Sequence, residues 1–478
     1  MKRTLLAATL SAAVLPALAQ ISVGGVPYGL RMGLDRTAIP TVHSAPFDAE
    51  AVAAEDAERE SKHILPAYGR SLAVDADLHN AGTWTDLPNG DRVWRLRIVS
   101  DGALATELYY EDLFLPNDAA LYLYDDAGEQ LVGGFTGVNN KASGLFATAQ
   151  LLGESCIVEY YEPHAVAGQG HFRIAKVGHA YRQVRDAAAD ACEVDVNCSE
   201  GANWTEQRDG VVRISVTEDG VQGWCTGSLV NNVEQNCRAF ILTANHCGIN
   251  PSADDYAQWK FYFKYQRPGC DQGTALAGSS LTGCAERGES NDNGGDSGSD
   301  FLLVEADDPI PNNFNPYWCG WDATGTGGSN GVCIHHPSGD EKKISTYTSN
   351  LSSSTWFTVP NTHWRVTWAG TANGHGVTEG GSSGSPLFNS AHRIIGTLTG
   401  GGSDCNSPSN PDLFGKMSYH WQSDPGPTAD KLKNWLDPNS TGTLTMDGSY
   451  GPCGTLGVHD VAAVEAPGLY PNPAFDKV

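Results

Sequence analysis

The residues best suited to catalysis include a serine in a glycine-rich run late in the chain. Ser383 lies in Gly-Gly-Ser-Ser-Gly-Ser-Pro at 380–386, where flanking glycines permit a tight turn that presents the hydroxyl. The backbone N–H groups of Gly381 and Ser383 can converge beside that hydroxyl and form an oxyanion hole. Taken alone, the run fits a flexible Gly/Ser linker equally well.

A histidine ends an apolar segment upstream of this serine. Residues 240–248 read Phe-Ile-Leu-Thr-Ala-Asn-His-Cys-Gly, so His246 is predicted at a strand end beside a half-cystine that can hold it in place. A histidine held in this way can act as a general base. A purely structural histidine is the alternative, and the downstream serine loop argues against it.

An aspartate supplies a third group. Asp300 precedes the apolar segment Phe-Leu-Leu-Val at 301–304. A partly buried carboxylate there can accept the N–H of a histidine, fix its tautomer and stabilise the imidazolium. Many other acids are present, so composition alone does not select Asp300. The order His246, Asp300, Ser383 is that of chymotrypsin-type hydrolases and differs from the subtilisin and α/β-hydrolase orders.

The segments that must position these residues are β-rich. From residue 192 to about residue 448, short apolar strands alternate with glycine-rich turns, a pattern typical of all-β barrel proteins. Apolar residues at helical spacing predict one C-terminal helix over 428–436, which a proline at 438 ends.

The N-terminal half carries a second β-rich region without a catalytic constellation. Segments 93–99, 120–124 and 156–161 indicate strands, and we expect a small β-sandwich between residues 69 and 171, after a loose arm with one short helix. A polar, Ala- and Asp-rich linker follows at 182–191. Arg185 in this linker is a candidate processing site, and an ordinary interdomain linker is the alternative.

Whole-chain properties indicate an exported protein of two or three domains. Lys2, Arg3, an apolar run over 4–18 and a small-x-small site ending at Ala19 predict a signal peptide over 1–19, too short to span a bilayer. The net charge of −26 over 478 residues disfavours nucleic acid or an anionic membrane as a partner. Twelve cysteines without a Cys-x-x-Cys motif indicate disulfides, so no metal or cofactor is predicted.

Together these motifs resemble the bacterial lysyl endopeptidases, a branch of the trypsin-like serine proteases. The resemblance covers slightly more than half of the chain. Its matching stretches are Cys-Thr-Gly-Ser-Leu-Val-Asn-Asn at 225–232, Thr-Ala-Asn-His-Cys-Gly at 243–248, Ser-Asp-Phe at 299–301, Ile-His-His-Pro at 334–337, Glu-Lys-Lys-Ile-Ser at 341–345, Gly-Val-Thr-Glu at 376–379 and Gly-Ser-Ser-Gly-Ser-Pro at 381–386.

The resemblance implies an all-β fold. A trypsin-like double β-barrel protease domain with a C-terminal helix is expected over 187–448, with the triad in the cleft between the barrels. A β-rich pro-region is expected over 20–186. A C-terminal tail is expected over 449–478. Its last residues, 469–478, resemble the start of a sorting domain of type IX secretion cargo, and an ordinary tail is the alternative.

The family also implies a carboxylate at the base of the pocket that receives the basic P1 side chain. Asp412, in Asp-Leu-Phe-Gly at 412–415, is the candidate, Asp404 is its rival, and a turn aspartate is the structural alternative. Trp356 maps to an aromatic residue that the family places near the substrate. Thr399, before Gly400, stands where the family has histidine, and this departure favours acceptance of Arg beside Lys.

The cysteines match the family in part. The resemblance implies Cys192–Cys405, Cys198–Cys270 and Cys225–Cys247. Cys319 and Cys333 are expected to pair on neighbouring strands, Cys237 with Cys284 is a guess, and Cys156 and Cys453 remain unassigned. Adjacent His335 and His336 point to opposite faces of a strand, so we expect a structural role rather than a metal site. The oxygen-rich loop 290–300 fits either a solvated loop or a calcium site, and the solvated loop is favoured.

The sequence therefore predicts a secreted, monomeric serine endopeptidase. It is expected to cleave proteins or peptides after Lys or Arg through an acyl-enzyme, with its own pro-region as an intramolecular inhibitor. A catalytically inactive protease-fold binding protein is one alternative, and a trypsin-like protease with non-basic P1 specificity is the other.

Overall fold

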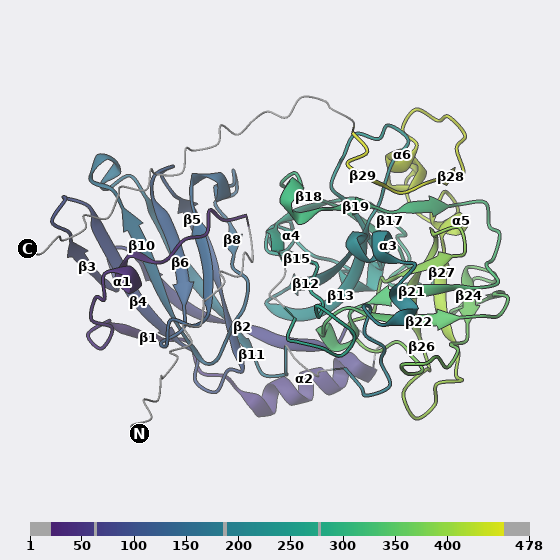
Figure 1. The fold of residues 1–478 in the computed structure, drawn as a ribbon, viewed down its shortest axis with the longest axis horizontal. Coiled ribbons are helices and arrows are strands. Elements are labelled where there is room, and N and C mark those ends of the chain that lie inside the picture. Colours follow the sequence, from purple (N-terminus) through teal and green to yellow (C-terminus); the bar gives the residue numbers. More distant parts are fainter. Residues whose placement is uncertain (1–20, 62–64, 185–188, 276–278, 454–478) are drawn as a thin grey trace, which may run out of the picture.

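The computed structural model of the chain describes residues 21–61, 65–184, 189–275 and 279–453 (Figure 1). Its secondary structure is mostly β-sheet with few helices, as predicted. The signal peptide, Arg185 and the tail beyond residue 453 lie outside the described residues. Within the described ranges, no helix is both long enough and apolar enough to cross a membrane. The α-helices are α1 (Tyr28–Arg31), α2 (Ala49–Ser61), α3 (Thr205–Gly210), α4 (Ala253–Tyr256), α5 (Met417–His420) and α6 (Lys433–Leu436).

One sheet belongs wholly to the N-terminal half. In its β4 strand, Trp94, Leu96 and Ile98 face the core on alternate positions, as the sequence predicts, and Arg95 between them is buried too. The strands of this six-stranded sheet are β1 (Thr41–His43), β3 (Thr83–Asp86), β4 (Arg92–Val99), β6 (Ala120–Tyr124), β7 (Leu131–Phe135) and β10 (Ser155–Glu162).

The second sheet crosses the predicted boundary between the two halves. β2 pairs with β11 on one side and with β13 on the other, so strands of both halves share one twelve-stranded sheet. The β-rich region of the N-terminal half is therefore not a separate sandwich, because one of its sheets continues into the C-terminal half. Its strands are β2 (Ala67–Asp77), β5 (Ala105–Phe114), β8 (Phe146–Ala147), β9 (Leu151–Leu152), β11 (His171–Ala180), β12 (Val211–Glu218), β13 (Val221–Leu229), β14 (Phe240–Thr243), β15 (Lys260–Phe263), β16 (Ser279–Thr282), β17 (Cys284–Glu289) and β18 (Leu302–Ala306).

The third large sheet belongs to the C-terminal half. Its nine strands are β20 (Gly320–Asp322), β21 (Gly331–His335), β22 (Lys343–Tyr347), β23 (Ser352–Ser354), β24 (His363–Val366), β25 (Pro386–Asn389), β26 (Arg393–Gly401), β27 (Asp412–Lys416) and β28 (Thr445–Met446). A separate ribbon pairs β19 (Tyr317–Trp318) with β29 (Ser449–Tyr450). The expected single helix over 428–436 is instead a 3₁₀ turn, Thr428–Asp430, followed by α6, because Lys431 has an extended backbone.

Buried side chains join the two halves. The ring of Tyr68 in β2 stacks on Trp224 in β13 with centroids 4.3 Å apart. Lys260 Nζ lies 3.1 Å from Glu107 Oε1, and both side chains are almost wholly buried. Figure 1 shows α2 and β2 running between the purple-blue N-terminal half and the teal-to-yellow remainder. The N-terminal half is thus packed against the other half through a shared sheet and a shared core.

Four disulfides lie in the described residues. The structure joins Cys192 to Cys405, Cys198 to Cys270 and Cys225 to Cys247, the three pairs that the resemblance implies, and it joins Cys237 to Cys453. The guess that Cys237 pairs with Cys284 is therefore wrong. Cys284 and Cys156 are unpaired and buried.

The expected pairing of Cys319 with Cys333 is also wrong, since both are unpaired and buried. Alternation along β21 explains the error. Val332 and Ile334 face the core cluster that contains Cys319, whereas Cys333, one residue out of step, faces a different cluster. The sulfurs of Cys319 and Cys333 therefore lie on different sides of the sheet, although the sequence predicts the two residues on neighbouring strands.

Candidate active site

Strand pairing brings His246 and Asp300 together. β14 ends at Thr243 and leads into a 3₁₀ turn, Asn245–Cys247, that carries His246. β18 runs antiparallel to β14 with Thr243 opposite Leu302, so the residues just before β18 lie beside that turn. The Cys225–Cys247 disulfide ties the turn to β13. The two predicted site residues are thereby placed by buried apolar strands.

Both carboxylate oxygens of Asp300 contact His246. His246 Nδ1 lies 2.7 Å from Asp300 Oδ2, and the His246 backbone N–H donates to Asp300 Oδ1 at 2.9 Å. Asp300 is fully buried. Burial of the imidazole opposes its protonation, but the Asp300 carboxylate outweighs burial and raises the pKa of His246 above its ordinary value. The arrangement holds the proton on Nδ1 and leaves Nε2 available as a base.

Asp292 supports Asp300 from behind. Asp300 has a left-handed backbone (φ 62°), which is unfavourable for a residue with a side chain. Its N–H donates to Asp292 Oδ2 at 2.8 Å, while Asp292 Oδ1 accepts the Ser290 hydroxyl at 2.6 Å and the Gly295 N–H at 2.9 Å. The oxygen-rich loop 290–300 therefore uses Asp292 to fix the backbone at Asp300. Sequence reasoning gave Asp292 no such role, and its spacing to Asp300 carries no motif.

The Ser383 loop is anchored through its backbone. The Thr226 N–H donates to the Ser383 carbonyl at 2.8 Å, and the Gly384 N–H donates to the Leu398 carbonyl at 2.8 Å. Gly384 has φ 79°, and a Cβ there would lie 2.1 Å from Thr243 Oγ1. Only glycine permits so close an approach of the loop to β14. Ser383 itself remains half-exposed.

The peptide group before Gly381 is also fixed. The Gly380 carbonyl accepts the Ser338 N–H at 2.6 Å. Because the carbonyl and N–H of one trans peptide point in opposite directions, the Gly381 N–H points away from Ser338. The Gly381 carbonyl accepts the Thr226 hydroxyl at 2.9 Å.

The histidine pair has a structural role here. His335 contacts the hydroxyls of Ser382 and Ser345 through its two ring nitrogens, at 2.8 and 3.1 Å. His336 Nδ1 lies 2.9 Å from the Asp340 carbonyl. Burial lowers the pKa of His335 to about 3 and that of His336 well below its ordinary value, so both rings are neutral. His335 thus holds the residue that precedes Ser383.

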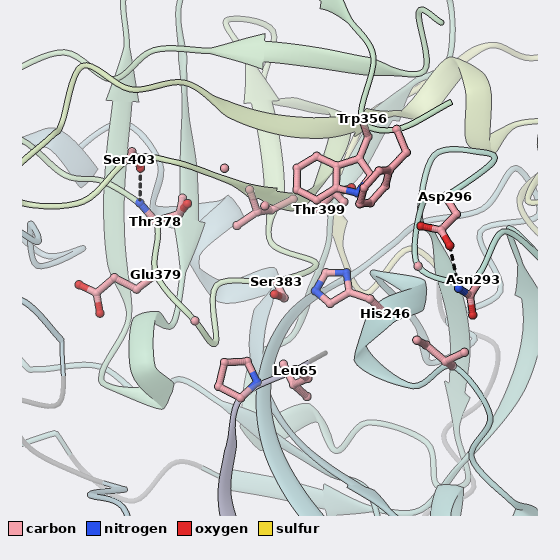
Figure 2. A pocket seen from close by; sticks show the side chains of 18 residues that line it. Leu65, His246, Asn293, Asp296, Trp356, Thr378, Glu379, Ser383, Thr399 and Ser403 are labelled. Atoms are coloured by element: carbon pink, nitrogen blue, oxygen red, sulfur yellow. Dashed lines mark hydrogen bonds between the residues drawn. The ribbon is translucent and has the colours of Figure 1, made fainter. Parts of the chain in front are cut away.

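His246 and Ser383 line one cavity of about 590 Å³. Figure 2 shows the imidazole directed toward Ser383, with Trp356 and Thr399 on one side of the pair and Leu65 on the other. Gly400, Gly401, Ser403 and Thr378 complete the wall on the Thr399 side. Sequence reasoning missed Leu65, because a residue so distant in the chain gives no local signal of its place.

Asp412 lies behind this wall. It is fully buried, and its carboxylate accepts hydrogen bonds from Trp368 Nε1 (2.6 Å), Thr378 Oγ1 (2.8 Å), Ser403 Oγ (2.6 Å) and Ser403 N–H (3.1 Å). Burial raises its pKa above the ordinary value of a carboxyl group, against the effect of these donors. The four donors are neutral. The rival Asp404 is exposed and accepts the N–H groups of Asn406 and Ser407 in a surface turn.

A histidine from another strand lies beside Thr399. His363, at the start of β24, places Nε2 3.0 Å from Thr399 Oγ1. The Trp356 ring lies 6.1 Å from the His363 ring at an interplanar angle of 32°. A Cβ on Gly400 would lie 3.0 Å from the Trp356 ring, so a larger residue there would press on this ring. Trp356 and Thr399 thus line the cavity together, with His363 behind them, and their contact with substrate stays a prediction.

The comparisons with known proteins point to one family. Residues 187–415 match the family model of the lysyl endopeptidase C-terminal domain. Over 389 residues the chain is 28% identical to the lysyl endopeptidase of Pseudomonas aeruginosa, across 74% of this chain and 81% of that protein.

Solved structures of proteases show weaker similarity. Protease Anisep from Arthrobacter nicotinovorans is 16% identical, with 44% of this chain and 90% of that chain covered and a TM-score of 0.33. The thermostable serine protease AL20 from an extremophilic microorganism is 12% identical, with 44% and 93% covered and a TM-score of 0.32. The sequence matches are therefore the stronger comparison, and on them the chain is a lysyl endopeptidase-like serine endopeptidase.

Proposed function

We propose that the chain hydrolyses peptide bonds after basic residues, with His246, Asp300 and Ser383 as its catalytic triad. The observation that carries this proposal is the 2.7 Å contact between His246 Nδ1 and a fully buried Asp300 carboxylate, at the wall of the cavity that Ser383 also lines. We further propose that the sheets of the C-terminal part form the two β-barrels of a trypsin-like protease.

The proposed reaction passes through an acyl-enzyme. His246 Nε2 takes the hydroxyl proton of Ser383 as Oγ attacks the scissile carbonyl, and Asp300 stabilises the imidazolium that forms. The N–H groups of Gly381 and Ser383 are the proposed donors to the oxyanion. The imidazolium then protonates the leaving amine, which departs. Water attacks the acyl-enzyme with His246 as the base, and the acid product leaves Ser383 free again.

The proposed specificity for Lys, and for Arg beside it, depends on Asp412. Two residues that hydrogen-bond its carboxylate, Thr378 and Ser403, line the cavity that contains Ser383. A buried carboxylate bonded only to neutral donors retains a net charge that an ammonium or guanidinium can balance. Thr399 in place of a family histidine supports acceptance of Arg.

Export and maturation are part of the same proposal. A signal peptide over 1–19, a pro-region over 20–186 that keeps the enzyme latent, and a protease domain over 187–448 would give a secreted monomer. Disulfides are consistent with an oxidising compartment. Arg185 is the proposed processing residue, and N-terminal sequencing of the mature protein tests it. A start far from residue 186 would refute that site.

The test of the proposed chemistry is Ser383→Ala, with Ser390→Ala in an exposed turn as the matched control. We expect Ser383→Ala to lose both hydrolysis of Lys-amide substrates and labelling by a fluorophosphonate, while Ser390→Ala keeps both. Retained hydrolysis in Ser383→Ala would refute the triad. Absence of labelling in the unsubstituted protein after removal of the pro-region would favour a non-catalytic binding protein. A peptide-library profile without a basic P1 residue would favour the other alternative.

A further inference from the structure

We propose that the leaving-group side of the cleft is an apolar subsite, and that Leu65 of the N-terminal half fills it in the intact chain. Substrates with an apolar side chain after the scissile bond would then compete with the chain's own segment for this subsite. The inference rests on the proposed roles of His246 and Ser383, and it adds to them the chemical class of the residue accepted on the leaving-group side.

Leu65 occupies the cleft in the way expected for a side chain of a bound peptide. It is 5% exposed and lines the same cavity as His246 and Ser383. It also belongs to the apolar cluster that contains Ile241 and both halves of the Cys225–Cys247 disulfide. This cluster consists of aliphatic, aromatic and sulfur-containing side chains, so it suits an apolar side chain rather than a charged one.

The backbone around Leu65 is guided into the cleft by the sheet. β2 pairs antiparallel with β13, with Gly69 opposite Gln222 and Ala67 opposite Gly223. A Cβ on Gly223 would lie 2.5 Å from the Leu65 side chain, so this glycine leaves the room that Leu65 occupies. Addition of an extended segment to a sheet edge is a general way for a protein to hold a peptide.

Two further contacts fix the segment. Arg59 in α2 donates a hydrogen bond to the Leu65 carbonyl at 3.2 Å. Pro66 lines the cavity and lies against Gly380, where a Cβ would be 3.2 Å from the proline ring. Leu65 and Pro66 thus lie between the helix of the N-terminal half and the loop that carries Ser383.

The position of Leu65 identifies the side of the cleft. The proposed P1 wall, formed by Thr378, Thr399 and Ser403, lies on one side of Ser383 and His246, and Leu65 lies on the opposite side (Figure 2). A substrate places its P1 residue against that wall and its leaving group beyond the attacked carbonyl. The side that Leu65 occupies is therefore the leaving-group side.

The test compares two peptides on full-length protein that carries Ser383→Ala, so that no cleavage or self-processing occurs. One fluorescent peptide ends at a P1 Lys amide, and the other continues past Lys with Leu-Pro-Ala. Both are titrated into the Ser383→Ala protein and into the same protein with Leu65→Asp, Leu65→Ala or, as control, Leu104→Asp. Leu104 is an exposed leucine of the same half, away from the cavity.

We expect Leu65→Asp to tighten binding of the extended peptide about tenfold or more, since a fully buried leucine contributes that much to occupancy of an apolar site. Leu65→Ala should also tighten binding of the extended peptide, by a smaller factor, and this gain in affinity cannot come from an added charge. Binding of the short peptide should stay within about twofold. In the Leu65→Ala protein, replacing the Leu after the scissile Lys by Asp should weaken the extended peptide about tenfold.

Equal affinity of the extended peptide in all four proteins would overturn the inference. So would an equal gain in Leu104→Asp, or equal affinity of the Leu and Asp peptides. Circular dichroism and thermal melting identify a variant that has lost its fold. If Leu65→Asp has lost its fold, the comparison of the two peptides in Leu65→Ala tests the inference instead. Failure of the proposed triad is seen separately, as retained hydrolysis in Ser383→Ala, so the two failures are distinct.

Discussion

Asp412→Asn should remove the preference for a basic P1 residue. The change keeps the shape of the side chain and removes its charge, so that a Lys ammonium in the pocket loses its ionic partner. Leaving one buried charge of a pair uncompensated costs about 3 to 5 kcal/mol. That cost corresponds to a fall of about two to four orders of magnitude in kcat/KM for a Lys substrate. A substrate with a neutral P1 residue should change by less than about threefold.

The contacts of Asp412 also give the effect of this substitution on stability. Three donors converge on Oδ2, and an asparagine can place its carbonyl oxygen there. Its amide NH₂ then confronts the Ser403 N–H, which donates to Oδ1 in the structure. One buried hydrogen bond is lost, so the free energy of unfolding should fall by about 1 to 3 kcal/mol.

The assay measures kcat/KM for paired peptide amides with Lys, Arg, Gln or Leu at P1, with Asp404→Asn as the matched control. Asp404 is exposed, and its carboxylate accepts hydrogen bonds from its own turn, so its substitution should leave the Lys-to-Leu ratio unchanged. A ratio that survives in Asp412→Asn would refute the assignment, and loss of the ratio in Asp404→Asn would transfer it to the rival.

The pH dependence of the same ratio gives an independent check. Burial raises the pKa of Asp412, so this carboxyl takes up its proton at a higher pH than an exposed aspartate. Only the ionised form attracts a cationic side chain. As the pH falls through that raised pKa, KM for Lys substrates should therefore rise while KM for Leu substrates stays flat. A Lys-to-Leu ratio that does not depend on pH would contradict this role.

Two further changes test the site and the junction of the two halves. Asp292→Asn should move the acid limb of the pH profile of kcat/KM to lower pH, measured with a neutral-P1 substrate. The reason is that the Asp292 carboxylate helps to raise the pKa of His246, and the neutral imidazole is the active base. An acid limb that does not move would show that Asp292 has a purely structural role. Lys260→Met should lower the free energy of unfolding by about 3 to 5 kcal/mol, because it leaves the Glu107 carboxylate buried without its positive partner. The double variant with Glu107→Leu should recover most of that loss in denaturant titrations, and a double variant no more stable than Lys260→Met would show that the pair matters for another reason.

The sequence by itself determined the residue types and the local turns. Glycines around Ser383 and the apolar runs before His246 and after Asp300 are local patterns, so their places at a turn and at strand ends could be predicted. The alternation in β4 could be predicted for the same reason, because side chains alternate between the two faces of a strand. Three disulfides followed only from the resemblance to a family.

The tertiary structure alone decided which distant segments meet. Cys237 bonds to Cys453, and Cys333 faces away from Cys319, because strand register and face set sulfur positions that sequence spacing does not. Leu65 reaches the cleft for a related reason: β2 adds to β13 by backbone hydrogen bonds, which any sequence with the right extended shape can make. Pairing of this kind leaves no motif in the sequence, so the residue that closes one side of the cleft could be found only in the folded chain.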